Sequence, residues 1–122
     1  MTLMQGPWKK RKRVEQLPSV YFVRANTLRR FKIGRTTNLE SRLCELQCGC
    51  PSRLVLMGTI ECHDTEEAKE LEWLLHENFS AVRTIGEWFW LDKIARSKIR
   101  CFVDGYQACD LIPVFLETRS AA

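Results

Sequence analysis

The sequence predicts an α/β fold of the α+β type, in which a small sheet of short strands is flanked by helices. Two segments rich in β-branched and aromatic residues, Ser19–Arg24 and Arg30–Gly34, are separated by the short turn Ala25–Leu28 and indicate a hairpin. A third segment, Leu54–Ile60, is almost wholly apolar, as expected of a central strand. The chain has 122 residues, which suffice for one domain with one modest core.

Three segments between and after these strands have the caps and the periodicity of helices. Asp64 and Glu67 have the spacing of a capping box, and apolar residues recur every three to four positions after it. Gly105 is expected to end the last helix. The expected helices cover about residues 39–47, 65–79 and 93–104, and residues 86–91 form a compact aromatic strand or corner.

The chain divides into a basic N-terminal arm (residues 1–18), a folded domain (residues 19–105) and a C-terminal tail (residues 106–122) to which no element is assigned. The net charge of +4 agrees with a polyanionic partner. Consecutive cations in an arm are either solvated or bind phosphates, since each cation on a phosphate releases counterions. The arm contains five in a row: Lys9, Lys10, Arg11, Lys12 and Arg13.

Composition narrows the functional classes. Hydrophobic residues make up 45% of the chain, which argues against disorder. No apolar run approaches a membrane span of about 20 residues, and no secretory signal follows the early basic run. We therefore expect a cytoplasmic protein without a membrane partner, or a nuclear one if the source is eukaryotic, and free thiols rather than disulfides. The cluster Cys44, Cys48 and Cys50 lacks the paired spacing of structural zinc sites.

Four residues suggest chemistry on a phosphodiester, which requires an activated water, a cation or metal on the phosphate, and neutralisation of the leaving oxygen. Tyr21 or Lys32 can orient or deprotonate water, and both leave the hairpin on one face. Arg42 can hold phosphate oxygens. Glu72 lies at the edge of an apolar helix face, where a carboxylate needs a partner, and it can bind Mg²⁺ or Mn²⁺. Each also has an ordinary structural role as an alternative, in the core or in an ion pair.

The order and spacing of these residues resemble the GIY-YIG nuclease superfamily over about residues 19–92. The closest resemblance is to a subfamily common in phage and mobile-element proteins and present in a fungal meiotic protein. The matching motifs are Val20-Tyr21-Phe22, Lys32-Ile33-Gly34-Arg35, Leu46-Gln47 before Pro51, and Gly86-Glu87-Trp88-Phe89.

The resemblance implies a three-stranded, mostly antiparallel sheet and a metal-dependent DNA endonuclease. Tyr21 and Arg42 match the catalytic tyrosine and arginine of the family, and Glu72 matches the glutamate that holds one Mg²⁺ or Mn²⁺ ion. Lys32 stands where the family usually has a second tyrosine, and Ser19 stands where the motif begins with glycine.

The resemblance also implies a second group of residues beside the site, namely Arg35, His76 and Glu87. Arg35 is expected to contact DNA together with the arm. Trp88 either packs in the core, which we favour, or stacks on a base. Two alternatives stay open: a nucleic-acid-binding module that has lost turnover at Lys32, and a phage-encoded interaction protein on the same scaffold. A protein partner or a homodimer is also left open.

Overall fold

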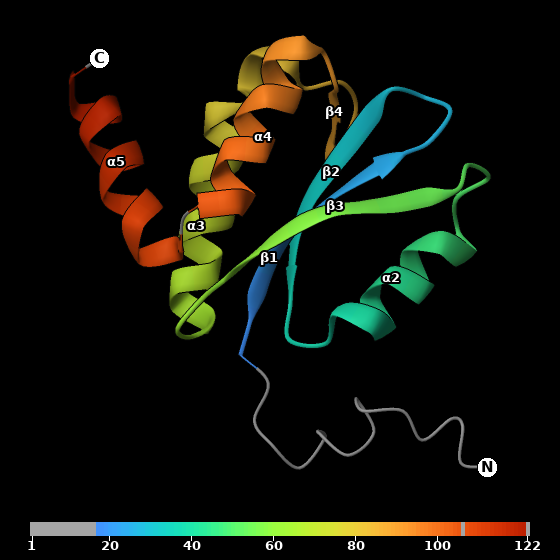
Figure 1. Cartoon of the computed structure of the whole chain (residues 1–122), viewed down its shortest axis with the longest axis horizontal. Coiled ribbons are helices and arrows are strands. Elements are labelled where there is room, and N and C mark those ends of the chain that lie inside the picture. The colour runs from blue at the N-terminus through green and yellow to red at the C-terminus, as the bar shows by residue number, and fades with distance from the viewer. Residues whose placement is uncertain (1–16, 106, 122) are drawn as a thin grey trace.

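The computed structural model describes residues 17–105 and 107–121, so the five cations of the arm lie outside the described residues. Four strands form one sheet in the order β3-β1-β2-β4, and every neighbouring pair is antiparallel. Figure 1 shows this sheet with helices on both sides. The strands are β1 (Ser19–Ala25), β2 (Arg30–Thr36), β3 (Leu54–Glu61) and β4 (Trp88–Trp90). The helices are α2 (Leu39–Cys48), α3 (Thr65–Asn78), the short 3₁₀ helix η2 (Ser80–Val82), α4 (Lys93–Gly105) and α5 (Ala108–Ala121).

The predicted fold class is confirmed, and the fourth strand is the one addition to the expected three. β4 pairs with the first three residues of β2, Arg30–Lys32. Its central residue, Phe89, is fully buried and stacks on Phe31 of β2 with the ring centroids 5.3 Å apart. Burial of this one aromatic ring attaches a three-residue strand to the sheet edge.

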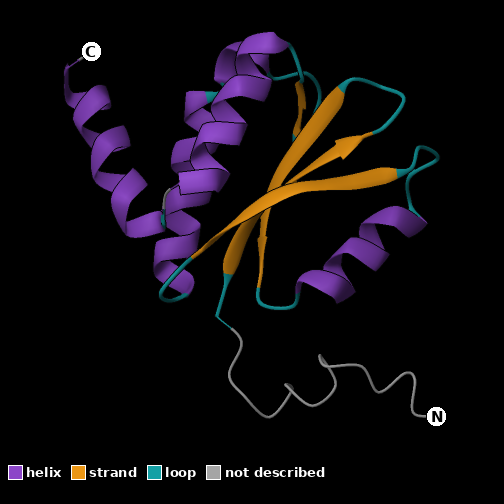
Figure 2. Ribbon diagram, viewed as in Figure 1, coloured by secondary structure: helices purple, strands orange, loops and turns teal. Residues whose placement is uncertain are grey.

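The two faces of the sheet have different roles. Phe22, Phe31, Ile33 and Phe89 belong to one face and join the main hydrophobic core. Helices α3, α4 and α5 lie together on one side of the sheet, and α2 stands apart on the other (Figure 2). Residues directly opposite one another on antiparallel strands point to the same face. The face toward α2 therefore carries the opposed pairs Tyr21 with Gly34, Val23 with Lys32, Lys32 with Trp88, and Arg30 with Trp90.

The expected helix caps are present. Asp64 accepts a hydrogen bond from the backbone N–H of Glu67 at 2.8 Å, and the Glu67 carboxylate accepts one from the backbone N–H of His63 at 2.6 Å. Asn38 caps α2 by accepting from Ser41 N at 3.2 Å. These bonds satisfy donors that a helix N-terminus otherwise leaves without partners.

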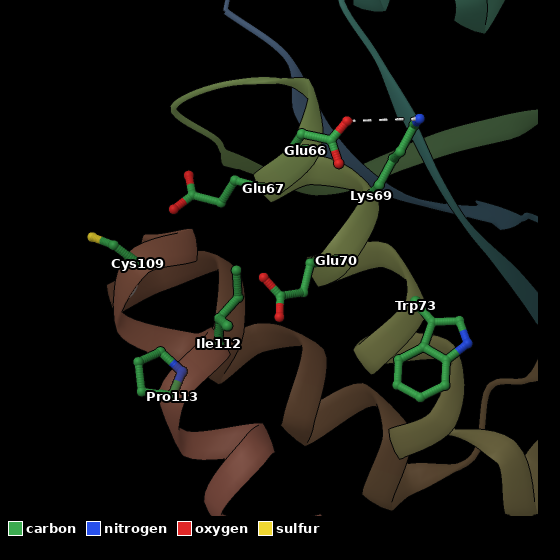
Figure 3. A pocket seen from close by; sticks show the side chains of 8 residues that line it. All are labelled: Glu66, Glu67, Lys69, Glu70, Trp73, Cys109, Ile112 and Pro113. Carbon is green, nitrogen blue, oxygen red and sulfur yellow. Dashed lines mark ion pairs between the residues drawn. The ribbon is translucent and has the colours of Figure 1, made fainter.

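The sequence pattern predicts no element in residues 106–122, but Ala108–Ala121 of this segment forms helix α5, which packs against α3. Ala108, Leu111 and Phe115 are buried, and the Phe115 ring meets Phe102 of α4 edge to face at 5.4 Å. Pro113 lies inside this helix, and a proline interrupts the pattern by which a helix is recognised in a sequence. Between α3 and α5 a groove of about 710 Å³ remains, which Figure 3 shows from close by. No helix in the described ranges is long and apolar enough to cross a membrane.

Candidate functional site

Tyr21 and Arg42 are in direct contact on the face of the sheet toward α2. Nε of Arg42 donates a hydrogen bond to the phenol oxygen of Tyr21 at 3.3 Å. Nη1 of the same guanidinium reaches the Glu45 carboxylate at 3.1 Å. The Tyr21 ring is 1% exposed, whereas 40% of the Arg42 side chain is exposed. The hydrogen bond with Tyr21, followed by the bond with Glu45, raises the pKa of the Arg42 guanidinium.

Gly34 makes this position of the tyrosine ring possible. It lies opposite Tyr21 in the β1–β2 ladder. A Cβ atom at residue 34 would lie 2.3 Å from the phenol oxygen and 2.5 Å from the ring carbon that carries it. The phenol can therefore lie across β2 toward Arg42 only because residue 34 has no side chain.

Lys32 lies on the same face as Tyr21 and forms an ion pair with Glu87. Only 9% of the Lys32 side chain is exposed, against 57% for Glu87. Glu87 precedes β4 in a turn where Gly86 has a φ of 62°, a conformation that favours glycine. The hydrogen bond from Lys32 holds the pKa of the Glu87 carboxyl below its usual value, and the positive charges of Lys32 and Arg42 act in the same direction.

Glu72 and His76 project from α3 toward β2. Nε of Arg35 donates to the Glu72 carboxylate at 3.0 Å. Nε2 of His76 lies 3.1 Å from the backbone carbonyl oxygen of Ile33, and since a carbonyl only accepts, this nitrogen carries the hydrogen. The His76 ring also meets Phe89 edge to face at 5.2 Å. β4 begins at Trp88, opposite Lys32, so its ladder with β2 does not extend to Ile33.

The structure thus brings the residues expected from the sequence into three pairs: Tyr21 with Arg42, Lys32 with Glu87, and Arg35 with Glu72. Within the described part of the chain, no hydrogen bond joins Glu72 to Tyr21 or to Arg42. The site is therefore not one closed cluster. The pairs of Tyr21 and of Lys32 lie on the face toward α2, whereas Arg35 alternates with Gly34 and meets Glu72 on the side of α3.

Two tryptophans on the same face belong to this region as well. Trp88 is half-buried and pairs with Lys32 in the ladder, so it faces α2. We favoured a place in the core for this residue, but it is not part of the core cluster. The guanidinium of Arg30 lies 5.0 Å from the centroid of the exposed Trp90 ring. The alternation Trp88-Phe89-Trp90 carries the signal for this arrangement, because a period of two sends the outer rings to one face and the middle ring to the other.

The potential metal ligands near the site are few. Among residues 17–105 and 107–121, no group of three or more His, Cys, Asp or Glu side chains is arranged to hold a metal ion. Glu72 offers one carboxylate. Its side chain is 23% exposed, and Arg35 binds one of its two oxygens. The cysteines are free thiols, and burial raises the pKa of Cys62 to about 11, which disfavours the thiolate that binds metals.

Comparison with known proteins identifies the family. Neither a curated protein nor a solved structure matches the chain. A family model described as the T5orf172 domain matches residues 19–104, which include all four strands and the three helices α2, α3 and α4 nearly in full. This domain is phage-associated and related to nuclease folds. The chain belongs to the T5orf172 domain family.

Proposed function

We propose that the chain is a DNA endonuclease of GIY-YIG type, which hydrolyses a phosphodiester bond with one Mg²⁺ or Mn²⁺ ion. The observation that carries the proposal is the contact between the Tyr21 phenol and the Arg42 guanidinium on the open face of the sheet. The family match and the order of the sequence motifs support it. The following paragraphs assign a role to each residue.

Arg42 binds the phosphate. Its bonds to Tyr21 and Glu45 use Nε and Nη1, and a guanidinium has five N–H donors in all. The remaining donors and the exposed part of the side chain can engage phosphate oxygens in a fork. A phosphate held there would lie next to the phenol oxygen of Tyr21.

Tyr21 carries the proton transfer. Its oxygen accepts from Arg42, so its own hydrogen is free to be donated. The adjacent guanidinium stabilises negative charge that develops on this oxygen when the phenol takes part in proton exchange. Burial of the ring holds the oxygen in one position, which is the geometric requirement for a group that acts in the transition state.

Glu72 would hold the metal ion. Mg²⁺ is commonly bound by one or two carboxylates together with water and substrate phosphates, so a single glutamate fits such an ion better than it fits zinc. Arg35 occupies one oxygen of this carboxylate, and we propose that the guanidinium turns to the DNA backbone when DNA binds. When bound, the ion would act as a Lewis acid on the phosphoryl oxygens.

Lys32 positions the phosphate or the attacking water as a cation. Its ammonium is paired with Glu87, and an ammonium donates hydrogen bonds but has no lone pair to accept a proton. The lysine therefore replaces the second tyrosine of the motif as a source of positive charge and not as a base.

A DNA-binding module without turnover is the second candidate. Two observations favour it: Lys32 stands in place of a tyrosine, and both Glu72 and Glu87 are engaged by cations. The two candidates differ in whether Glu72 is needed for a chemical step.

The test is the incubation of supercoiled plasmid with the purified protein and Mg²⁺ or Mn²⁺, followed by separation of nicked and linear products. We expect the wild type to nick the plasmid and Glu72→Ala to abolish nicking, because the metal loses its carboxylate. Glu70→Ala is the matched control: it removes a carboxylate from the same helix, but on the side that lines the groove with α5 (Figure 3).

Three outcomes decide the proposal. Nicking by the wild type and by Glu70→Ala, but not by a folded Glu72→Ala protein, supports it. Equal rates for all three proteins would show that Glu72 is not the metal ligand. Absence of nicking by the wild type together with tight DNA binding would favour the module without turnover.

A further inference from the structure

A groove of about 430 Å³ lies beside the proposed site, between α2 and the strands β2 and β4. Leu46 of α2 and Pro51 in the loop after it form one wall. Leu28 of the hairpin turn and the indole of Trp88 contribute further apolar surface. The volume lies within the range of about 300–1,000 Å³ that is usual for small-ligand sites.

Hydrogen bonds hold the walls of this groove in place. The hairpin turn is tied to the loop after α2 by Asn26 N to Arg53 O at 2.8 Å and by the hydroxyls of Thr27 and Ser52 at 3.0 Å. Gln47, in the last turn of α2, donates to the backbone carbonyl of Ser52 at 3.0 Å. Turn, loop and helix end are therefore one unit, and the groove exists before any ligand arrives.

The charges in the groove connect it to the proposed site. Arg30 and Lys32 line it from β2, and Lys32 is also the lysine of the motif. Nε of Arg30 is buried without a hydrogen-bond partner among the described residues. Glu45 lines the groove from α2 and binds Arg42 through its carboxylate. A ligand in the groove would thus lie next to a phosphate on Arg42.

A flat aromatic ring with polar edges and an attached phosphate matches this surface. Aromatic side chains bind nucleobases by stacking, and nearby Arg or Lys binds the backbone. A base inside a duplex cannot enter such a groove until it leaves the stack. An unpaired base avoids most of that cost.

We infer that the groove binds an unstacked nucleobase of DNA against Trp88, next to the phosphate held by Arg42. The placement next to that phosphate rests on the proposed function, whereas binding of the base itself does not require cleavage. The chain would consequently prefer DNA with an unpaired base over fully paired DNA.

The experiment measures binding of the full chain in a metal chelator, so that no cleavage occurs. Fluorescence anisotropy compares three duplexes: fully paired, with a single bulged nucleotide, and with a bulged abasic nucleotide that keeps the phosphate but lacks the base. We expect the bulged base to bind roughly 5- to 150-fold more tightly than the abasic bulge, the range that corresponds to stacking of one base.

Two variants and one control locate the effect. Trp88→Ala should remove the difference between base and abasic bulge. Leu46→Trp should remove it as well, by filling the groove from a half-buried position and leaving β4 intact. Trp73→Ala should preserve the difference, because Trp73 is an exposed tryptophan on α3 in the other groove (Figure 3).

Equal affinity of the wild type for the two bulges would overturn the inference, as would a difference that survives in a folded Trp88→Ala or Leu46→Trp protein. Because the assay needs no turnover, a protein that fails to cut plasmid can still show the base preference. Conversely, a nuclease without the preference would refute only the nucleobase groove.

Discussion

The ion pair between Lys32 and Glu87 is the clearest departure from the motif at the scale of single residues. Lys32 is almost buried, and a buried charge is costly unless it is paired. Glu87 supplies the partner from a turn 55 positions away along the chain. The lysine is therefore tolerated beneath the surface only because this turn brings a carboxylate to it.

The Lys32–Glu87 pair should make the free energy of unfolding depend on pH. The pKa of Glu87 is lowered from 4.5 by Lys32, so the pair stabilises the fold above pH 4.5 and loses this contribution as the pH falls through the lower, folded pKa. Glu87→Gln should therefore be less stable than the wild type at neutral pH, and the difference should shrink below about pH 4.5. Urea unfolding of both proteins between pH 3 and 7 measures this, and a difference that does not change with pH would contradict the role of the carboxylate.

The candidate site residues come from the sequence motif and stay a prediction, whereas the structure supplies most of their partners. Tyr21, Arg42 and Glu72 follow from the motif, and Tyr21 does contact Arg42. An ion pair of Glu72 with an arginine was one expected alternative, but neither Arg35 as its partner nor the pair of Lys32 with Glu87 was predicted. Both pairs depend on where β4 and α3 pack against β2, which local sequence patterns do not encode.

At the scale of elements, β2 shows how a strand can serve packing and site together. Its alternate residues Phe31 and Ile33 enter the core, while Lys32 and Gly34 face α2. Gly34 has no side chain, and the Tyr21 ring occupies the space that a Cβ atom would fill. With a side chain at this residue, the phenol would lose its position.

Gly34→Ala should consequently displace Tyr21 and break its bond with Arg42. We expect a loss of stability of about 1–3 kcal/mol, typical of overpacking, together with loss of nicking activity. Gly49→Ala is the control for stability only, because a Cβ at residue 49 meets nothing within 4 Å but residue 49 lines the proposed nucleobase groove; its effect on stability should stay within about 0.5 kcal/mol. Thermal unfolding of both variants and plasmid nicking by Gly34→Ala check this, and a stable, active Gly34→Ala protein would refute the packing argument.

Long elements with clear signals were predicted closely. The short segment 86–91 was expected as a strand or corner but not as a fourth strand of the sheet, and the proline-containing α5 was not predicted. The hairpin, β3, and the helices α2, α3 and α4 agree with expectation to within a few residues. β4 has only three residues and forms through burial of Phe89, which is a tertiary effect. α5 contains Pro113 and packs against α3. Neither the helix propensity nor the apolar periodicity of this segment therefore predicts a helix.

At the scale of the whole molecule, the two sides of the sheet contribute unequally to stability and to the proposed chemistry. Helices α3, α4 and α5 lie on one side and α2 on the other (Figure 1). The side with α3 contains the main core and also supplies Glu72, whereas the side with α2 has the Tyr21–Arg42 contact and the nearby groove. The open side can therefore present charged and aromatic groups to DNA without interrupting the core.

Deletion of residues 1–13 tests the basic run, which lies outside the described residues. The deleted run of five cations contributes up to roughly five phosphate contacts, each worth about −0.9 in the slope of log affinity against log salt on duplex DNA. We expect weaker DNA binding, a flatter salt dependence and unchanged folding. Binding isotherms from low to high salt measure the slope, and an unchanged slope would assign the arm to targeting or to solvation.

The most direct test of the central claim is the single-turnover cleavage rate of Tyr21→Phe beside those of the wild type and Lys32→Tyr, with protein in excess over DNA. Tyr21→Phe removes only the hydroxyl that Arg42 contacts and keeps the buried ring. The account predicts almost no cleavage by Tyr21→Phe and retained activity in Lys32→Tyr, which restores the usual residue of the motif. Full activity in Tyr21→Phe would contradict the account, because the proton transfer would then not pass through Tyr21.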